Sequence, residues 1–123
     1  IEELSLYLKS LSNSLKCPCL VYNKAIFSTD NLPLKFYINS FDETSSILKF
    51  NDNFDFNFKA KTVNQIDVLS ISVDTIFTEN ALKKIDILKI DVQGAELLAL
   101  KGAFNTLKYT DLVLIETSLR PMY

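Results

Sequence analysis

One stretch of the sequence, residues 85–102, changes its hydrophobic period within a few positions and so constrains the fold strongly. It begins with a short, mostly apolar run, IDILKI at residues 85–90, which is typical of a strand buried on both faces. A polar turn follows at residues 91–94, and strong helix formers occupy residues 95–100. A second apolar run, LVLI, comes at residues 112–115. The chain between the two runs is long enough for the crossover that joins parallel strands, so the stretch predicts a βαβ unit.

Two acidic residues lie where the two predicted strands of this unit end. Asp91 directly follows the first strand, and Glu116 directly follows the second. Ligands of open α/β sheets bind outside the carboxyl ends of the strands. We therefore expect Asp91 and Glu116 to lie at the edge of the sheet where a ligand binds.

The composition excludes several classes of site. A length of 123 residues predicts one domain, and 48% hydrophobic residues are enough for a core. A net charge of −2 gives no electrostatic reason to expect nucleic acid or an anionic membrane as a partner, and no apolar run is long enough for a membrane-spanning helix. The chain contains no histidine, which excludes Ser-His-Asp and Cys-His catalysis and any histidine metal site.

The two cysteines, Cys17 and Cys19, lie one residue apart without further metal ligands nearby. We interpret them as small apolar residues at the start of a strand, and we expect no metal site. Reduced cysteines predict a cytoplasmic protein.

The rest of the chain shows weaker periodic patterns. They predict a helix over residues 1–16, strands over 19–23, 34–39 and 67–73, and a helix over 75–82. We expect a loop at residues 51–57, Asp74 as the N-cap of the helix that follows it, and Gly102 as the C′ residue of the central helix. The strands near 19–23, 85–90 and 112–116 are expected to be parallel, with a β-hairpin inserted between residues 34 and 73.

The central stretch also carries a recognisable motif, KIDVQGAELLALKGA at residues 89–103, followed by the strand LVLIET. Together with Asn23, Ala25 and Ile26, the paired serines at 45–46 and Val73-Asp74, it resembles the FkbM-type family of S-adenosylmethionine-dependent class I methyltransferases. The resemblance implies a Rossmann-like α/β fold with a mixed sheet and S-adenosylmethionine as the cofactor. It also implies O-methylation of a hydroxyl on a sugar or another small metabolite.

The resemblance implies roles for individual residues. Asp91 would lie near the sulfonium and the acceptor, where a carboxylate either stabilises the cationic cofactor or takes a proton from the acceptor hydroxyl. Asn23 would face the adenine of the cofactor, and Ala25 would also belong to the cofactor-binding residues. The alternatives are structural. Asp91 would cap the following helix, and Asn23 would be a turn residue at the end of its strand, where asparagine is common.

Three further polar residues are candidates for binding the acceptor, namely Gln93, Glu96 and Glu116. A glutamate in the first turn of a helix is also favoured by the helix dipole, so Glu96 has an equally good structural explanation. Gly94 between them lets the backbone turn tightly or approach a ligand closely. Lys89 and Tyr123 receive no role from the sequence.

One part of the family pattern is absent. The family begins with a strand and a glycine-containing loop for the methionine end of the cofactor, but no glycine precedes Gly94. We therefore expect residues 1–123 to be a single partial methyltransferase domain that lacks its N-terminal cofactor-loop half, its natural packing partner. The alternative is a non-catalytic α/β binding or interaction module. A third hypothesis, a nucleotide-binding domain of another kind, has less support, because the chain has no phosphate-binding glycine loop.

Overall fold

The computed structural model describes residues 2–14, 19–51, 60–118 and 122–123. The helical elements are α1 (Glu2–Ser14), α2 (Val73–Glu79) and α3 (Glu96–Lys101), with the 3-10 turns η1 (Asp42–Thr44) and η2 (Thr106–Tyr109). The strands are β1 (Ala25–Ile26), β2 (Pro33–Asn39), β3 (Thr62–Ile71), β4 (Ile85–Ile90) and β5 (Thr110–Ile115). They form two small sheets, β1-β3-β2 and β4-β5. None of the helices in the described ranges has the length and hydrophobicity needed to cross a bilayer.

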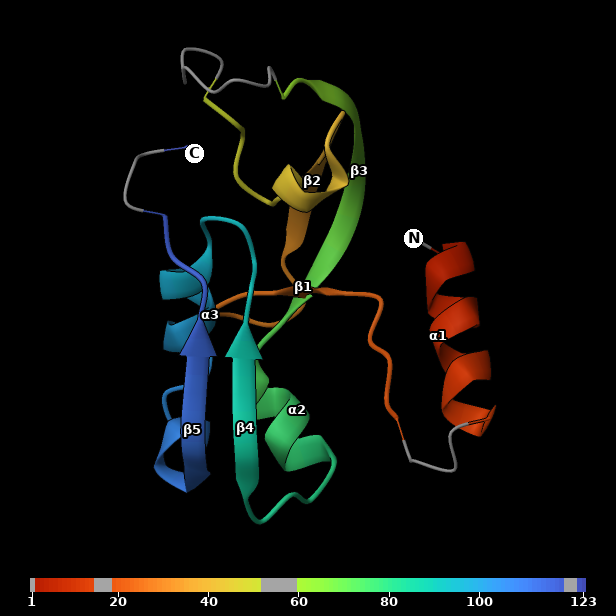
Figure 1. Cartoon of the computed structure of the whole chain (residues 1–123). Helices are drawn as coiled ribbons and strands as arrows, with labels where there is room; N and C mark the ends of the chain where they lie inside the picture. The colour runs from red at the N-terminus through yellow and green to blue at the C-terminus, as the bar shows by residue number, and fades with distance from the viewer. Residues whose placement is uncertain (1, 15–18, 52–59, 119–121) are drawn as a thin grey trace.

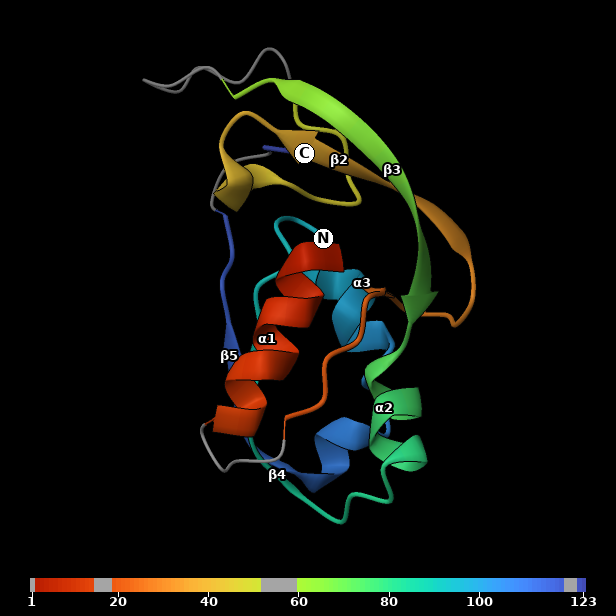
Figure 2. The same cartoon turned by 90° about the vertical axis from the view of Figure 1, so that its right-hand side faces the viewer.

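The predicted βαβ unit is confirmed. Strands β4 and β5 are parallel, with Ile87 opposite Leu112, and α3 connects them. Helices α2 and α3 lie on one side of this sheet (Figures 1 and 2). Three alanines at a spacing of four residues, Ala95, Ala99 and Ala103, are almost completely buried. Their small side chains allow the backbone of this segment to pack closely against its neighbours.

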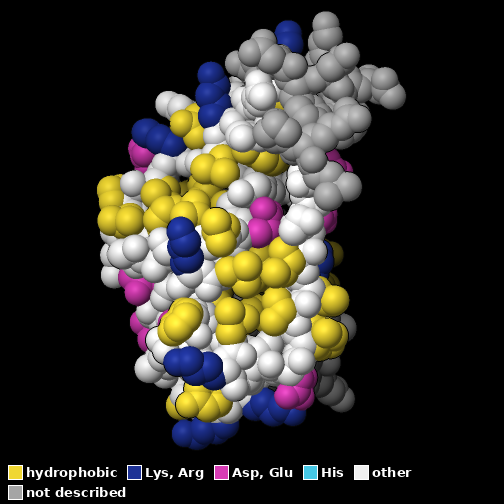
Figure 3. All heavy atoms as spheres, turned by 90° about the vertical axis from the view of Figure 1, so that its left-hand side faces the viewer, with side chains coloured by type: hydrophobic (Ala, Val, Ile, Leu, Met, Phe, Trp, Pro, Cys, Tyr) yellow, Lys and Arg dark blue, Asp and Glu magenta, His cyan; other side chains and the backbone are white. Residues whose placement is uncertain are grey.

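The opposite face of the β4-β5 sheet is bare, so the prediction that β4 is buried on both faces is wrong for the described chain. Side chains alternate between the faces of a strand, and only one face is covered by helices. Ile87 is 60% exposed, and its neighbours Leu112 and Leu114 are about half exposed. Figure 3 shows another side of the molecule, that of β5 and α3, where hydrophobic side chains also gather across the middle.

The predicted hairpin insertion is also confirmed. Strands β2 and β3 pair antiparallel, with Phe36 opposite Ile66, and β3 is longer than the predicted strand at residues 67–73. The hairpin lies beyond the carboxyl ends of β4 and β5 (Figure 1). The loop expected at residues 51–57 lies outside the described residues except for Asn51.

The prediction of a strand at residues 19–23 is wrong. Strand structure occurs only at Ala25–Ile26, which pairs in parallel with Ser70 and Ile71 of β3. Of the three strands expected to be parallel, only β4 and β5 share a sheet, and the mixture of parallel and antiparallel pairs is found in β1-β3-β2. The apolar residues before Ala25 lack a partner strand in the described chain, and without one the backbone forms no ladder of hydrogen bonds.

The N-terminal helix expected over residues 1–16 is observed as α1, which stands apart from both sheets, on the side of β4 away from β5 (Figure 1). Its apolar side chains Leu6 and Tyr7 are about 60% exposed, and Leu8 and Leu11 are 38% exposed.

Asp74 is not the N-cap of α2, contrary to prediction. The helix begins at Val73, two residues earlier than expected, and Ser72 caps it by accepting a hydrogen bond from the backbone N–H of Thr75. The carboxylate of Asp74 instead accepts hydrogen bonds from the backbone N–H groups of Asn105 and Thr106 (shortest distance 2.7 Å) and from the Thr106 hydroxyl at 2.6 Å. Asp74 therefore joins α2 to η2, two segments that are distant in the sequence.

Gly102 ends α3, but not as a left-handed C′ residue. It is the C-cap itself, with a φ of −77° that any residue can adopt. A Cβ atom at this position would lie 2.2 Å from the carbonyl oxygen of Phe27. The glycine is therefore required by the close approach of the segment after β1 and not by its conformational freedom.

We predict that Asp74→Asn lowers the free energy of unfolding by about 1–3 kcal/mol at neutral pH, because buried donors lose an acceptor. Burial alone raises the pKa of Asp74, but the bonds from Thr106 and Asn105 outweigh it and the pKa lies below its ordinary value. A lowered pKa stabilises the fold above the unfolded value of 3.8 and loses this contribution as the pH falls through the folded value.

Urea unfolding of wild type and Asp74→Asn at a series of pH values checks this expectation. The difference between the two proteins should shrink as the medium becomes acidic below about pH 4. A difference that stays constant down to acidic pH would contradict the role of the ionised carboxylate.

Candidate functional site

The turn after β4 is held in an unusual backbone conformation. Gln93 has a φ of +50° and Gly94 a φ of +94°, so two successive residues are left-handed. Gly94 also meets a close neighbour, because a Cβ atom there would lie 2.5 Å from the ring of Tyr123. The tight turn predicted for Gly94 is confirmed, and the close neighbour that the structure shows is the Tyr123 ring. The Ser46 hydroxyl donates a hydrogen bond to the carbonyl oxygen of Val92 at 3.4 Å and so joins the turn to the hairpin.

Asp91 lies at the carboxyl end of β4, where the sequence placed it, and its side chain is 30% exposed. Its two carboxylate oxygens accept hydrogen bonds from different donors, one from Lys89 Nζ at 2.9 Å and the other from Gln93 Nε2 at 2.8 Å. Lys89 reaches it because residues two apart point to the same face of a strand. The bond from Lys89, followed by that from Gln93, lowers the pKa of Asp91, while Asp91 raises the pKa of Lys89. Asp91 is thus an anion at neutral pH.

Asn23 and Ala25 line a hollow of about 530 Å³ between the segment before β1 and the hairpin. Its apolar walls include Phe36, Ile38 and Val68. The exposed side chain of Asn23 adds an amide to this largely apolar surface.

A second hollow of about 220 Å³ shares Ala25 and Phe36 with the first and extends to Asp91 and Gln93. The fold therefore brings together three residues singled out from the sequence, Ala25, Asp91 and Gln93. Asn23 lies in the adjoining hollow.

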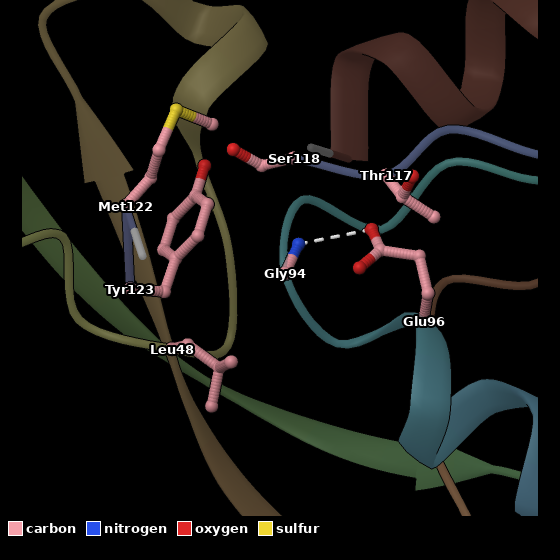
Figure 4. A pocket seen from close by; sticks show the side chains of 7 residues that line it. All are labelled: Leu48, Gly94, Glu96, Thr117, Ser118, Met122 and Tyr123. Carbon is pink, nitrogen blue, oxygen red and sulfur yellow. Dashed lines mark hydrogen bonds between the residues drawn. The ribbon is translucent and has the colours of Figure 1, made fainter. Parts of the chain in front are cut away.

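Glu96 borders a different hollow of about 220 Å³ on the other side of the turn (Figure 4). We call it the Glu96 pocket; it is lined by Leu48, Gly94, Glu96, Thr117, Ser118, Met122 and Tyr123. One carboxylate oxygen of Glu96 accepts a hydrogen bond from the backbone N–H of Gly94 at 2.9 Å, as Figure 4 shows. Glu96 therefore stabilises the turn and also presents a carboxylate to the pocket.

Glu116 does not line either of the hollows that contain Asp91 or Glu96. Its backbone N–H donates to the carbonyl oxygen of Ile90 at 3.1 Å and extends the pairing of β5 with β4. Its charge contributes to the raised pKa of Lys89. The three acidic candidates thus lie around one end of the β4-β5 sheet and create a negative potential there.

Two residues that the sequence left without a role belong to this site. Lys89 pairs with Asp91, and the signal for this was their spacing of two residues across the end of β4. Tyr123 donates from its hydroxyl to the carbonyl oxygen of Thr44 at 3.0 Å and to Gln93 Oε1 at 3.4 Å. No local pattern predicts that contact, because Thr44, Gln93 and Tyr123 are distant in the sequence.

The described residues contain no group of three or more acidic or cysteine side chains arranged to hold a metal ion. Cys19 is a free, exposed thiol, and Cys17 lies outside the described residues.

A family model described as the Methyltransferase FkbM domain matches residues 1–123. The chain belongs to the FkbM methyltransferase family. The resemblance drawn from the central motif is thereby confirmed, and it implies a Rossmann-like methyltransferase fold. Members of the FkbM family typically use S-adenosylmethionine, and membership implies a small acceptor substrate. Comparison with curated proteins and with solved structures gave no match.

We predict that Gly94→Ala destabilises this FkbM domain by about 1–3 kcal/mol, because it strains a left-handed position and displaces the Tyr123 ring. Thermal or urea unfolding measures the loss. Leu97→Ala is the control, since Leu97 is 64% exposed on α3 and leaves the turn unchanged. Equal stability of Gly94→Ala and wild type would show that the turn tolerates a side chain and that the ring moves freely.

Proposed function

We propose that this chain supplies the reaction edge of an S-adenosylmethionine-dependent O-methyltransferase that acts on a hydroxyl of a sugar or another small metabolite. The observation that carries the proposal is the Asp91 carboxylate. It is ionised, lies at the carboxyl end of a parallel strand and borders a hollow that it shares with Ala25 and Gln93. Ligands of α/β sheets bind at this kind of edge.

The residues of the two adjoining hollows fit two parts of the cofactor. The apolar walls and the Asn23 amide suit an adenine ring, which is flat and carries hydrogen-bonding groups at its edge. The Asp91 carboxylate suits the positive charge of a sulfonium. When bound, S-adenosylmethionine supplies an electrophilic methyl group. We propose that Asn23 and Ala25 hold the adenine side and that Asp91 faces the sulfonium.

The environment of Asp91 favours one of its two possible roles. Lys89 and Gln93 both stabilise the carboxylate and lower its pKa, which makes it a weak proton acceptor at neutral pH. A fixed anion is better suited to stabilise positive charge and to orient the acceptor hydroxyl. We therefore propose that Asp91 acts by charge and placement, since methyl transfer depends chiefly on close in-line positioning.

We propose that the acceptor is bound by the polar groups around the turn, namely Gln93, Glu96 and Glu116. Glu96 presents its carboxylate to a pocket that Thr117 and Tyr123 also line. Carboxylate and hydroxyl groups can accept and donate hydrogen bonds to the several hydroxyls of a sugar.

The bare face of the β4-β5 sheet supports the proposal that residues 1–123 form part of a larger methyltransferase domain. Ile87, Leu112 and Leu114 remain exposed on this face, which is unusual for apolar residues on neighbouring strands. Further strands carrying the family's glycine-containing loop would cover them. The same surface supports the alternative of a non-catalytic interaction module, in which another chain covers the face. We also propose a cytoplasmic location, which suits the free thiol of Cys19.

The test uses the natural full-length protein and the substitution Asp91→Asn. Loss of a charged contact in the transition state predicts a fall in methyl transfer of about 10- to 100-fold, measured by mass spectrometry of the methylated acceptor. Asp86→Asn is the matched control, because Asp86 is an exposed aspartate of the same strand outside the site.

Calorimetric titration with S-adenosylhomocysteine gives the second measurement. Wild type and Asp86→Asn should bind with equal affinity. Full methylation activity of Asp91→Asn would remove Asp91 from the mechanism. Absence of S-adenosylhomocysteine binding by the wild-type protein would favour the interaction module.

A further inference from the structure

A chain of hydrogen bonds runs from Tyr123 to Asp91. The single proton of the Tyr123 hydroxyl is shared between the carbonyl oxygen of Thr44 at 3.0 Å and Gln93 Oε1 at 3.4 Å, and Gln93 Nε2 donates to Asp91 Oδ1 at 2.8 Å. Lys89 Nζ completes the chain at the second carboxylate oxygen, at 2.9 Å. Gln93 is therefore the link between the aspartate and a tyrosine 32 residues further along the chain.

The chemistry of the two ends determines which way the Gln93 amide points. An ionised carboxylate only accepts hydrogen bonds, so the NH₂ group must face Asp91. The amide oxygen then faces Tyr123, whose hydroxyl supplies a donor. If the amide turned over, its oxygen would face the carboxylate, and the tyrosine proton would keep only its acceptor at Thr44. The longer branch of the tyrosine hydrogen bond therefore adds to the orientation that the carboxylate already favours, in which Gln93 supports Asp91.

Tyr123 is itself held firmly in place. Its ring lies against Gly94, where even a Cβ atom would be only 2.5 Å away. The ring also makes an edge-to-face contact with the buried Phe50, with ring centroids 5.7 Å apart. The neighbouring carbonyl oxygen of Met122 accepts a hydrogen bond from the backbone N–H of Asn51 at 2.8 Å. In addition, the hydroxyl donates to the carbonyl oxygen of Thr44 at 3.0 Å, so the hairpin fixes its position.

The charged groups around the network are compatible with this arrangement. Asp91 is faced by Lys89 from β4, by Glu116 after β5 and by Lys24, which lines the same hollow. Burial first, and then Glu96 and Glu116, raise the pKa of Tyr123 to about 12. The hydroxyl therefore keeps its proton, and remains a donor, throughout the physiological range.

We propose that Tyr123 is a positioning residue for Asp91, which it orients through the side-chain amide of Gln93. This inference rests on the proposed function for its effect on catalysis. The physical coupling itself, between Tyr123, Gln93 and Asp91, is independent of which reaction the site performs. The hairpin and the last residues of the sequence would then act on the reaction edge without touching the reacting atoms.

The first test measures the coupling without activity. Tyr123→Phe keeps the ring against Gly94 and Phe50 but removes the donor. The titration of the Asp91 carboxyl carbon is followed by NMR in the natural full-length protein. Its midpoint should move to higher pH in Tyr123→Phe, because Gln93 stabilises the anion less well. Gln93→Met, which deletes the link, should move it further, and Tyr109→Phe, remote from the turn, should leave it unchanged.

The outcomes separate the alternatives. An unchanged Asp91 midpoint in Tyr123→Phe, whether or not Gln93→Met shifts it, would overturn the proposal. If Tyr123→Phe fails to fold, the reciprocal measurement decides, because coupling acts equally in both directions. In Gln93→Met the signal of the Tyr123 phenol carbon should then shift, and an unchanged phenol signal would overturn the proposal.

The second test concerns catalysis. Tyr123→Phe should lower kcat about two- to tenfold, as expected for one weakened hydrogen bond, and should move the acidic limb of the pH profile upward together with the NMR midpoint. A wild-type protein without methyl transfer would contradict the proposed function, while the NMR midpoints would still decide the positioning role. A fall in kcat with an unmoved acidic limb would overturn the effect of Tyr123 through Asp91.

Discussion

The turn between β4 and α3 is the constraint on which the candidate site depends. Two successive left-handed residues, Gln93 and Gly94, reverse the chain within a very short distance. That reversal brings the Gln93 amide within hydrogen-bonding distance of Asp91. It also leaves room beside Gly94 for the Tyr123 ring, because glycine has no side chain. The hairpin reaches the same turn through Ser46. Strand, helix, hairpin and the last residues of the sequence therefore meet at a few backbone positions, and their chemistry follows from that meeting.

The two sheets contribute differently to this arrangement. The parallel pair β4-β5 directs its acidic residues to one end, as parallel strands do. The β1-β3-β2 sheet supplies an apolar wall, with Phe36 and Val68, beside that end. The face of β4-β5 away from α2 and α3 carries Lys89, which bonds Asp91, and exposes Ile87 and Leu112.

Much of the central unit follows from local pattern. The β4-α3-β5 order and the position of Asp91 rest on hydrophobic period, strand ends and turn residues, all of which lie close together in the sequence. The predictions that were wrong concern partners. Residues 19–23 are apolar enough for a strand, but strand structure forms only where Ala25 and Ile26 meet β3. Asp74 has the chemistry of a cap, yet its carboxylate is taken by the distant Thr106. Glycine is required at position 102 because the backbone of Phe27 lies close to it, and its own φ does not require glycine.

The sequence by itself determined the family, the parallel strand pair and the carboxylate at the end of β4, because each depends on residues within one short segment. Only the tertiary structure decided what surrounds that carboxylate. Lys89 and Gln93 each lie two residues from Asp91 in the sequence, but the contact of the Gln93 amide oxygen with Tyr123 and the wall of the adjoining hollow depend on distant segments. Contacts of this kind arise from packing between distant segments, and a pattern read along one segment carries no information about them.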